Sequence, residues 1–365
     1  MRTVMASVGV VLAATWVLSA QGAPSSEART AEQVYKNIVA LKGTPASELN
    51  QAMHLMKGAV GVDCTYCHIE REWDKDVGAK AVARQMILMM MDINTRQFGG
   101  RQVVTCNTCH NGQPIPASMP AFPVLEPKPP QKLVLPSTDQ VLTRYVDALG
   151  GAAAIGKLSS RVITGTQYIP TGPGGTTPMP AVMERYLQAP NRTLTVYRTA
   201  TFTTSQGFDG TTAWTQNQNG AVGEPVALDA ARARRAADFH EPLNLRKQYT
   251  QITVTGIEKV NGRDAYVLVG VPQNDKPERL YFDTQTGLLL RKVTVLPTPI
   301  GDSPFQTDFD DYRDTGSGVK FPFLIQMNPA NPRTELAPSA TLRVTKVEDN
   351  AAIDAARFAR PAAAK

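Results

Sequence analysis

All four cysteines of this chain lie in two copies of one five-residue pattern, C-x-x-C-H. The members of the two copies are Cys64, Cys67 and His68, and Cys106, Cys109 and His110. This spacing is typical of c-type haem attachment, in which two thiols add across the two vinyl groups of a haem and the next histidine binds its iron. The chain is therefore predicted to hold two covalently bound haem c groups, with His68 and His110 as iron ligands.

A zinc site and a thioredoxin-like redox pair also use closely spaced cysteines. Zinc would not require a histidine directly after each second cysteine. Disulfide bonds would use up the cysteines without explaining either histidine. The haem interpretation explains all six residues.

Each proximal histidine is expected to donate its Nδ1–H to a carbonyl or carboxylate, which fixes the ring. The opposite side of each iron then needs another ligand. Before the first motif, Met53, His54 and Met56 compete, and His54 points about 100° away from Met53 around a helix. Both therefore cannot face one iron, and the sequence leaves the choice open.

Before the second motif, Met86, Met89 and Met90 share one helix face at i, i+3 and i+4. A methionine stripe of this kind usually belongs to a core. Here a haem face has to be covered, which favours a ligand among them. Methionine ligation would raise the reduction potential above that of a bis-histidine site.

The elements that must position these residues are predicted to be helical. Apolar periodicity predicts helices over residues 31–41, 46–60 and 80–96, the last two leading into the haem motifs. Residues 113–136 are rich in proline and are expected to form either a stiff extended connector or a strap along the surface of the haem module. From residue 137 one amphipathic helix, Thr138 to Leu149, is followed by strand-like segments.

Hairpin signals recur in this second half. Asn261-Gly262 lies between two alternating segments, and Gly287 and Gly316 to Gly318 mark two further turns. Nine to eleven antiparallel strands are expected, with one or two helices against them, one being Ala227 to Phe239. The predicted fold class is α+β with two domains, a mostly helical dihaem module and an antiparallel sheet domain.

The N-terminus resembles a secretory signal, with Arg2 before a mostly apolar run from Val4 to Leu18. The run is shorter than the roughly 20 residues of a membrane-spanning helix. The predicted organisation is a signal peptide (1–23), a dihaem domain (24–112), a linker (113–136), a sheet domain (137–358) and a flexible tail (359–365). Export to the periplasm or another extracytoplasmic space fits covalent haem attachment.

In 365 residues the net charge is +6. This mild basicity suits docking to an acidic redox partner. Nothing is clustered enough to predict nucleic-acid binding.

Residues 34–116 resemble one half of the cytochrome c subunit of photosynthetic reaction centres, a tetrahaem protein built from two dihaem halves. The resemblance is carried by residues 63–68, 82–86, 92–94 and 104–110. In that family a helical methionine before each of three haem motifs binds the distal haem face. The resemblance implies Met86 and Met53 as sixth ligands.

The chain departs from that family in having two motifs rather than four, no lipid-anchor cysteine, and no counterpart of the histidine ligand to the fourth haem. The loop of residues 70–78 keeps Trp73 but differs after it. The resemblance therefore implies electron transfer rather than photosynthesis.

The second half resembles Lol-type lipoprotein carriers and periplasmic lipid-binding folds, on residues 145–151, 207–210 with Trp214, 311–313 and 319–322. This implies a curved half-barrel around an apolar cavity. A lipid, a lipoprotein, another apolar ligand or a docking partner is then expected at the sheet.

The sequence favours an exported, non-catalytic single-electron carrier between redox partners over an enzyme. The alternatives are a dihaem peroxidase with one open iron site, and a redox-linked lipid-binding, quinone-binding or sensing protein. A deep apolar pocket in the sheet half, as opposed to a filled core, would favour the last.

Overall fold

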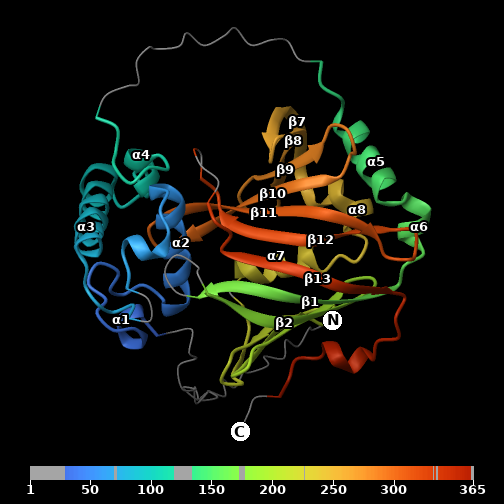
Figure 1. Ribbon diagram of the computed structural model, residues 1–365, viewed down its shortest axis with the longest axis horizontal. Coiled ribbons are helices and arrows are strands. Elements are labelled where there is room, and N and C mark those ends of the chain that lie inside the picture. Colours follow the sequence, from blue (N-terminus) through green and yellow to red (C-terminus); the bar gives the residue numbers. More distant parts are fainter. Residues whose placement is uncertain are drawn as a thin grey trace, which may run out of the picture.

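The computed structural model describes residues 29–69, 72–118, 134–171, 177–225, 227–331, 333 and 336–362. The predicted signal peptide and most of the predicted proline-rich linker fall outside these residues. The described chain consists of a helical part, residues 29–118, and a part dominated by one large sheet, residues 134–362 (Figure 1).

The helical part is built around α2 and α3, each of which precedes a C-x-x-C-H motif. Its elements are α1 (Ala31–Val34), η2 (Ala46–Glu48), α2 (Leu49–Val60), η3 (Cys64–Tyr66), α3 (Gly78–Phe98) and α4 (Cys106–His110). Leu55 of α2 and Ile87 and Met90 of α3 form a core with the residues around them. Gly61 ends α2 with φ 71°, and Gly99 ends α3 with φ 60°, the left-handed backbone that glycine adopts without steric cost.

The helix predicted for residues 31–41 is wrong in length, because α1 ends at Val34. Asn37 has a left-handed backbone with φ 59°. Its Nδ2 donates to Asp76 Oδ1 at 2.9 Å, and Arg84 donates to its carbonyl oxygen at 2.9 Å. These long-range contacts favour a loop over continuation of the apolar helical pattern. The other predicted helices are present with ends shifted by a few residues.

The second part forms one antiparallel sheet of 13 strands within the described residues, more than the nine to eleven expected. Its order is β6-β5-β4-β3-β2-β1-β13-β12-β11-β10-β9-β8-β7, so it is open, with β6 and β7 at the edges. The strands are β1 (Ser160–Thr171), β2 (Thr177–Gln188), β3 (Arg192–Arg198), β4 (Thr203–Phe208), β5 (Ala213–Gln216), β6 (Val222–Gly223), β7 (Tyr249–Val260), β8 (Arg263–Pro272), β9 (Glu278–Asp283), β10 (Leu289–Thr298), β11 (Gly301–Asp314), β12 (Lys320–Pro329) and β13 (Ala340–Asp349).

The predicted hairpins are confirmed by the register. β7 pairs with β8 across Val260 and Arg263, with Asn261 at φ 48° and Gly262 at φ 80°. Two positive φ values in a two-residue turn match the right-handed twist of the strands. The strands β5 and β6 are only four and two residues long, which is too short for an alternation pattern to reveal.

Short helices pack against the sheet, namely α5 (Thr138–Leu149), α6 (Ala152–Gly156), α7 (Ala227–Ala236), α8 (Glu241–Asn244) and the 3-10 turns η5 (Leu245–Gln248) and η6 (Ala355–Phe358). Ser137 caps α5 by accepting from the Gln140 N–H at 3.2 Å. Val141, Tyr145 and Leu149 of α5 pack against Leu268 and Phe282, so the core under this helix is filled with side chains.

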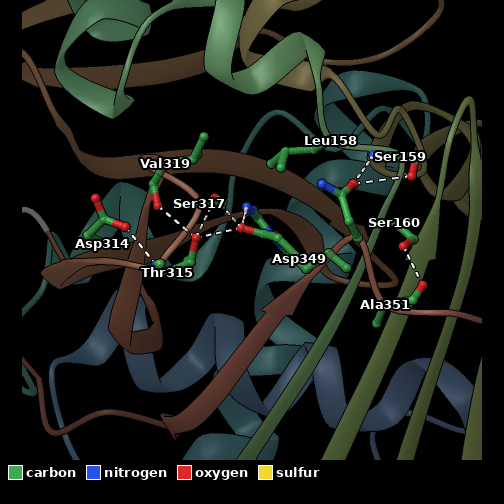
Figure 2. A network of polar contacts seen from close by, with 12 residues as sticks. Leu158, Ser159, Ser160, Asp314, Thr315, Ser317, Val319, Asp349 and Ala351 are labelled. Atoms are coloured by element: carbon green, nitrogen blue, oxygen red, sulfur yellow. Dashed lines mark hydrogen bonds and ion pairs between the residues drawn. The ribbon is translucent and has the colours of Figure 1, made fainter.

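A polar network surrounds the start of β1 and the end of β13, which are neighbours in the middle of the sheet (Figure 2). Asp349 accepts from Thr315 and from Ser317, the latter at 2.7 Å, and pairs with Arg161. Next to it the Ser160 hydroxyl donates to the Ala351 carbonyl at 2.6 Å. These bonds join the turn between β11 and β12 to the chain leaving β13.

The helical part packs directly onto the sheet part, with α2 against β10, β11 and β12. Figure 1 shows α2 beside the ends of these strands, whereas α5 and α6 lie at the opposite end of the sheet. Ile300, in the turn between β10 and β11, is buried in the core of the helical part. Within the described residues, none of the helices has the length and hydropathy that a membrane crossing requires.

Candidate functional site

The two C-x-x-C-H motifs form short helical turns, η3 for the first and α4 for the second. All four thiols are unpaired; Cys64 and Cys109 are exposed, and Cys67 and Cys106 are half-buried. Burial raises the pKa of Cys67 and Cys106. In the described residues no cluster of three or more His, Cys, Asp and Glu side chains is placed to hold a metal ion.

Each motif histidine hydrogen bonds to a backbone carbonyl through Nδ1, as predicted. His68 Nδ1 lies 3.2 Å from the Trp73 oxygen, and His110 Nδ1 lies 3.0 Å from the Gln113 oxygen. A carbonyl can only accept, so Nδ1 carries the proton in both rings. This tautomer leaves Nε2 as the nitrogen that can bind a metal, and the hydrogen bond fixes the ring.

The loop after the first motif is held by α3. Lys80 Nζ donates to the Trp73 oxygen at 2.7 Å, so this carbonyl accepts from Lys80 as well as from His68. The Trp73 ring also meets the His68 ring edge-on, with 5.5 Å between centroids. Burial lowers the pKa of His68, the bond to Trp73 opposes this, and the charges of Lys80 and Arg84 lower it further.

The segment before the second motif is fixed by a buried amide. Asn94, only 5% exposed, accepts from the N–H groups of Val103 and Val104 at 3.0 and 2.9 Å and donates to the Val104 oxygen at 2.7 Å. The Thr108 hydroxyl then accepts from the Thr105 N–H at 3.0 Å at the start of α4. The sequence offered a signal for Asn94, a polar residue amid the apolar positions of a long helix.

The three candidate ligands on α2 lie in two different surroundings. His54 faces the sheet part, where its ring meets Phe305 edge-on at 6.1 Å and Nδ1 lies 3.5 Å from the Ser339 hydroxyl. Burial lowers the pKa of His54, and the charge of Lys57 adds to the effect. Met53 and Met56 instead pack on the core of the helical part, which Cys106 also contacts.

The methionines of α3 also separate. Met90 is buried at 6% exposure and belongs to the core, whereas Met86 and Met89 are 38% and 46% exposed. The stripe predicted from the sequence thus contains one core residue and two surface residues.

Large apolar side chains on the surface gather in the helical part. Those of the described residues 29–118 are Val34, Tyr35, Val39, Tyr66, Ile69, Trp73, Val82, Met86, Leu88, Met89, Met91, Val103 and Ile115. Exposed apolar surface of this kind marks a place where a ligand or partner packs. Each motif thus offers two free thiols at C-x-x-C spacing, an oriented imidazole and nearby apolar surface. A covalent haem requires this donor set and environment.

Comparison with known proteins places the similarity in this part of the chain. Residues 5–143 match the family model described as the photosynthetic reaction centre cytochrome C subunit. The photosynthetic reaction center cytochrome c subunit of Rubrivivax gelatinosus is 34% identical over 90 residues, covering 24% of this chain and 25% of that protein. Its counterpart in Thermochromatium tepidum is 31% identical over 99 residues, covering 26% and 24%. The matched segment thus spans about a quarter of the length of these relatives.

The sheet part matches solved structures distantly. A DUF1329 family protein from Desulfovibrio piger has 12% identity and a TM-score of 0.42, over 60% of this chain and 96% of that one. A LolA superfamily protein from Nitrosomonas europaea has 11% identity and a TM-score of 0.41, over 62% and 98%. The helical part of this chain, which carries both C-x-x-C-H motifs, is thus similar to the photosynthetic reaction centre cytochrome c subunit.

Proposed function

We propose that this protein is an extracytoplasmic electron-transfer protein that carries two haem c groups. The observation that supports this most directly is the pair of C-x-x-C-H turns in which each histidine donates Nδ1–H to a carbonyl and keeps Nε2 for the iron. Cys64 and Cys67 would hold one haem, and Cys106 and Cys109 the other. A bound haem supplies a one-electron couple, while the protein sets its potential through ligands, hydrogen bonds and burial.

The proposal includes Met53 and Met86 as the sixth ligands, on the basis of the family resemblance. The contacts of His54 with Phe305 and Ser339 support a methionine of α2 over this histidine. The partial exposure of Met86 supports it over the core residue Met90.

For the sheet part we propose a scaffold that docks the helical part and the redox partners. The filled core beneath α5 supports a scaffold over an apolar cavity at that place. Binding of a lipid or lipoprotein is the alternative. Binding of a fluorescent fatty acid to the purified protein at micromolar concentration, and its displacement by an unlabelled fatty acid, would support that alternative. Such binding would contradict a role as a scaffold alone.

Haem content is tested by co-expression with a cytochrome c maturation system, followed by intact mass measurement of the exported protein. We expect an added mass of two haems. The paired substitutions Cys64→Ala with Cys67→Ala, and Cys106→Ala with Cys109→Ala, should each remove one. An unchanged mass in either double variant would contradict the proposal for that motif.

Electron transfer is tested by optical potentiometric titration. Two one-electron waves and six-coordinate low-spin spectra are expected. Steady turnover of hydrogen peroxide, with a high-spin haem, would favour the peroxidase alternative instead. Fractionation of the native host tests the location, which the predicted signal peptide supports.

A further inference from the structure

The two histidine-binding carbonyls are held by different parts of the molecule. The first, of Trp73, is held by Lys80 Nζ at 2.7 Å, and both residues belong to the helical part. The second, of Gln113, follows the turn Asn111-Gly112, and this turn is contacted by residues from the sheet part more than 200 positions away in sequence. The second site therefore depends on long-range contacts that the first does not use.

Two side chains of the segment between β12 and β13 make these contacts. Arg333 Nε donates to the Asn111 oxygen at 2.7 Å. Asn331 Nδ2 donates to the Gly58 oxygen at 2.9 Å and lies 3.4 Å from the Gly112 oxygen. The Oδ1 atom of Asn331 accepts from the Arg333 N–H at 2.7 Å, so the two residues act together.

Close packing leaves this turn little freedom. The Gly112 N–H donates to the Ala59 oxygen at 2.8 Å. A Cβ on Gly112 would lie 2.7 Å from Asn331 Oδ1, and one on Gly61 would lie 2.1 Å from the Gly112 oxygen. Three segments thus meet here, namely the end of α2, the turn after His110, and the segment that contains Asn331.

We propose that Asn331 and Arg333 are positioning residues for His110, through which the sheet part sets the potential of the second haem. The inference rests on the proposed function, because it requires haem at His110. Fixing the Asn111-Gly112 turn fixes the Gln113 carbonyl that accepts the His110 Nδ1–H. This hydrogen bond orients the ring and raises its basicity as a ligand.

The sign of the effect follows from that basicity. A weaker bond from Nδ1–H makes the imidazole a poorer electron donor, which favours the reduced iron over the oxidised iron. Releasing the turn should therefore raise the potential of the second haem. A tenfold change in the preference for reduced over oxidised iron corresponds to about 59 mV for a one-electron couple. Loss of the hydrogen-bond partner of a metal-binding histidine typically changes metal affinity or activity about 10- to 100-fold.

The test variant is Asn331→Ala in the full chain with both haems attached. Alanine adds no charge, which would itself shift the potential, and it removes both donor contacts of Asn331 Nδ2 and the acceptor for the Arg333 N–H. The matched control is Asn191→Ala, since Asn191 Nδ2 contacts the Gly210 oxygen at 3.4 Å elsewhere in the sheet part. The variant Lys80→Met assigns the signals of the first haem. Loss of the Lys80 ammonium removes a hydrogen-bond donor and a positive charge beside His68, so the haem that changes in this variant is the first.

Potentiometry followed by electron paramagnetic resonance reads each haem separately. We expect Asn331→Ala to raise the potential of the second haem and change its signal, with the first haem and the control unchanged. Should Asn331→Ala fail to mature, Arg333→Ala decides, because Arg333 is exposed and its removal leaves the core intact. An unshifted second haem in the variant that matures, or an equal shift of both haems, overturns the inference. Intact mass measurement checks the haem count independently. A protein without two haems would contradict the proposed function, whereas a protein with two haems and an unshifted second potential would contradict only the role of Asn331 and Arg333.

Discussion

Replacing Ile300 by alanine should destabilise the helical part, although Ile300 lies in the sheet part of the chain. This residue lies in the turn between β10 and β11 and is only 1% exposed. It is buried in one core with Leu55 of α2 and Ile87 of α3. The hairpin thus supplies a core side chain to a part of the chain that precedes it by about two hundred residues.

The magnitude follows from the buried carbon atoms. The change removes three side-chain carbons, worth about 0.8 kcal/mol each by transfer, or about 2.4 kcal/mol. The cavity left behind adds to this, and isoleucine-to-alanine changes in cores cost about 2–5 kcal/mol. We expect the free energy of unfolding to fall by about 3 kcal/mol.

Urea unfolding with two signals measures the effect. Circular dichroism in the haem Soret band reports on the helical part. In a Trp73→Phe background, the fluorescence of Trp214, which is 2% exposed and donates to the Phe358 oxygen at 3.1 Å, reports on the sheet part. The Soret transition should move to lower urea in Ile300→Ala. The control is Ile257→Ala, since Ile257 is 36% exposed on β7 and should change stability by less than about 0.5 kcal/mol.

A loss below about 1 kcal/mol in the Soret transition would contradict a core shared by the two parts. A shift seen with Trp214 alone would also contradict it, because the turn would then stabilise only the sheet part.

Three further predictions concern other contacts. Asp275 pairs with Arg232 and Arg235 and is 1% exposed; burial opposes ionisation, but these arginines hold its pKa below the usual value. Asp275→Asn should cost about 3 kcal/mol in urea unfolding at pH 7. Because the pKa of Asp275 is lower in the folded state, its contribution to the free energy of unfolding is complete above the unfolded-state pKa of about 3.9 and is lost as the pH falls below that value. A difference in unfolding free energy between wild type and variant that is equal at pH 7 and pH 2.5 would contradict this. Asn94→Ala should lower stability by about 2–3 kcal/mol, since it leaves backbone groups of Val103 and Val104 unpaired, and a thermal melt that matches wild type would argue against it. Met86→His should lower the potential of the second haem, whereas an unchanged spectrum and potential would show that another residue binds that iron.

Much of the fold follows from local sequence patterns. The Ser137 cap and apolar spacing specify α5 at its observed bounds, and Asn261-Gly262 specifies a hairpin because both residues tolerate positive φ. Where the local pattern is weak or long-range contacts compete with it, prediction fails. The two-residue strand β6 has no detectable period, and the helix after Ala31 ends early at contacts with Asp76 and Arg84.

The sequence by itself determined the paired thiols and the histidine beside each pair, because attachment chemistry depends on spacing within five residues. Only the tertiary structure decided that His54 faces Phe305 and that the Ala330 oxygen comes so near α2 that a Cβ on Gly58 would lie 3.1 Å from it. Only the tertiary structure brought Asn331 to the turn beyond His110. These contacts join residues far apart in the chain, and they arise from how whole elements pack, which no local propensity encodes.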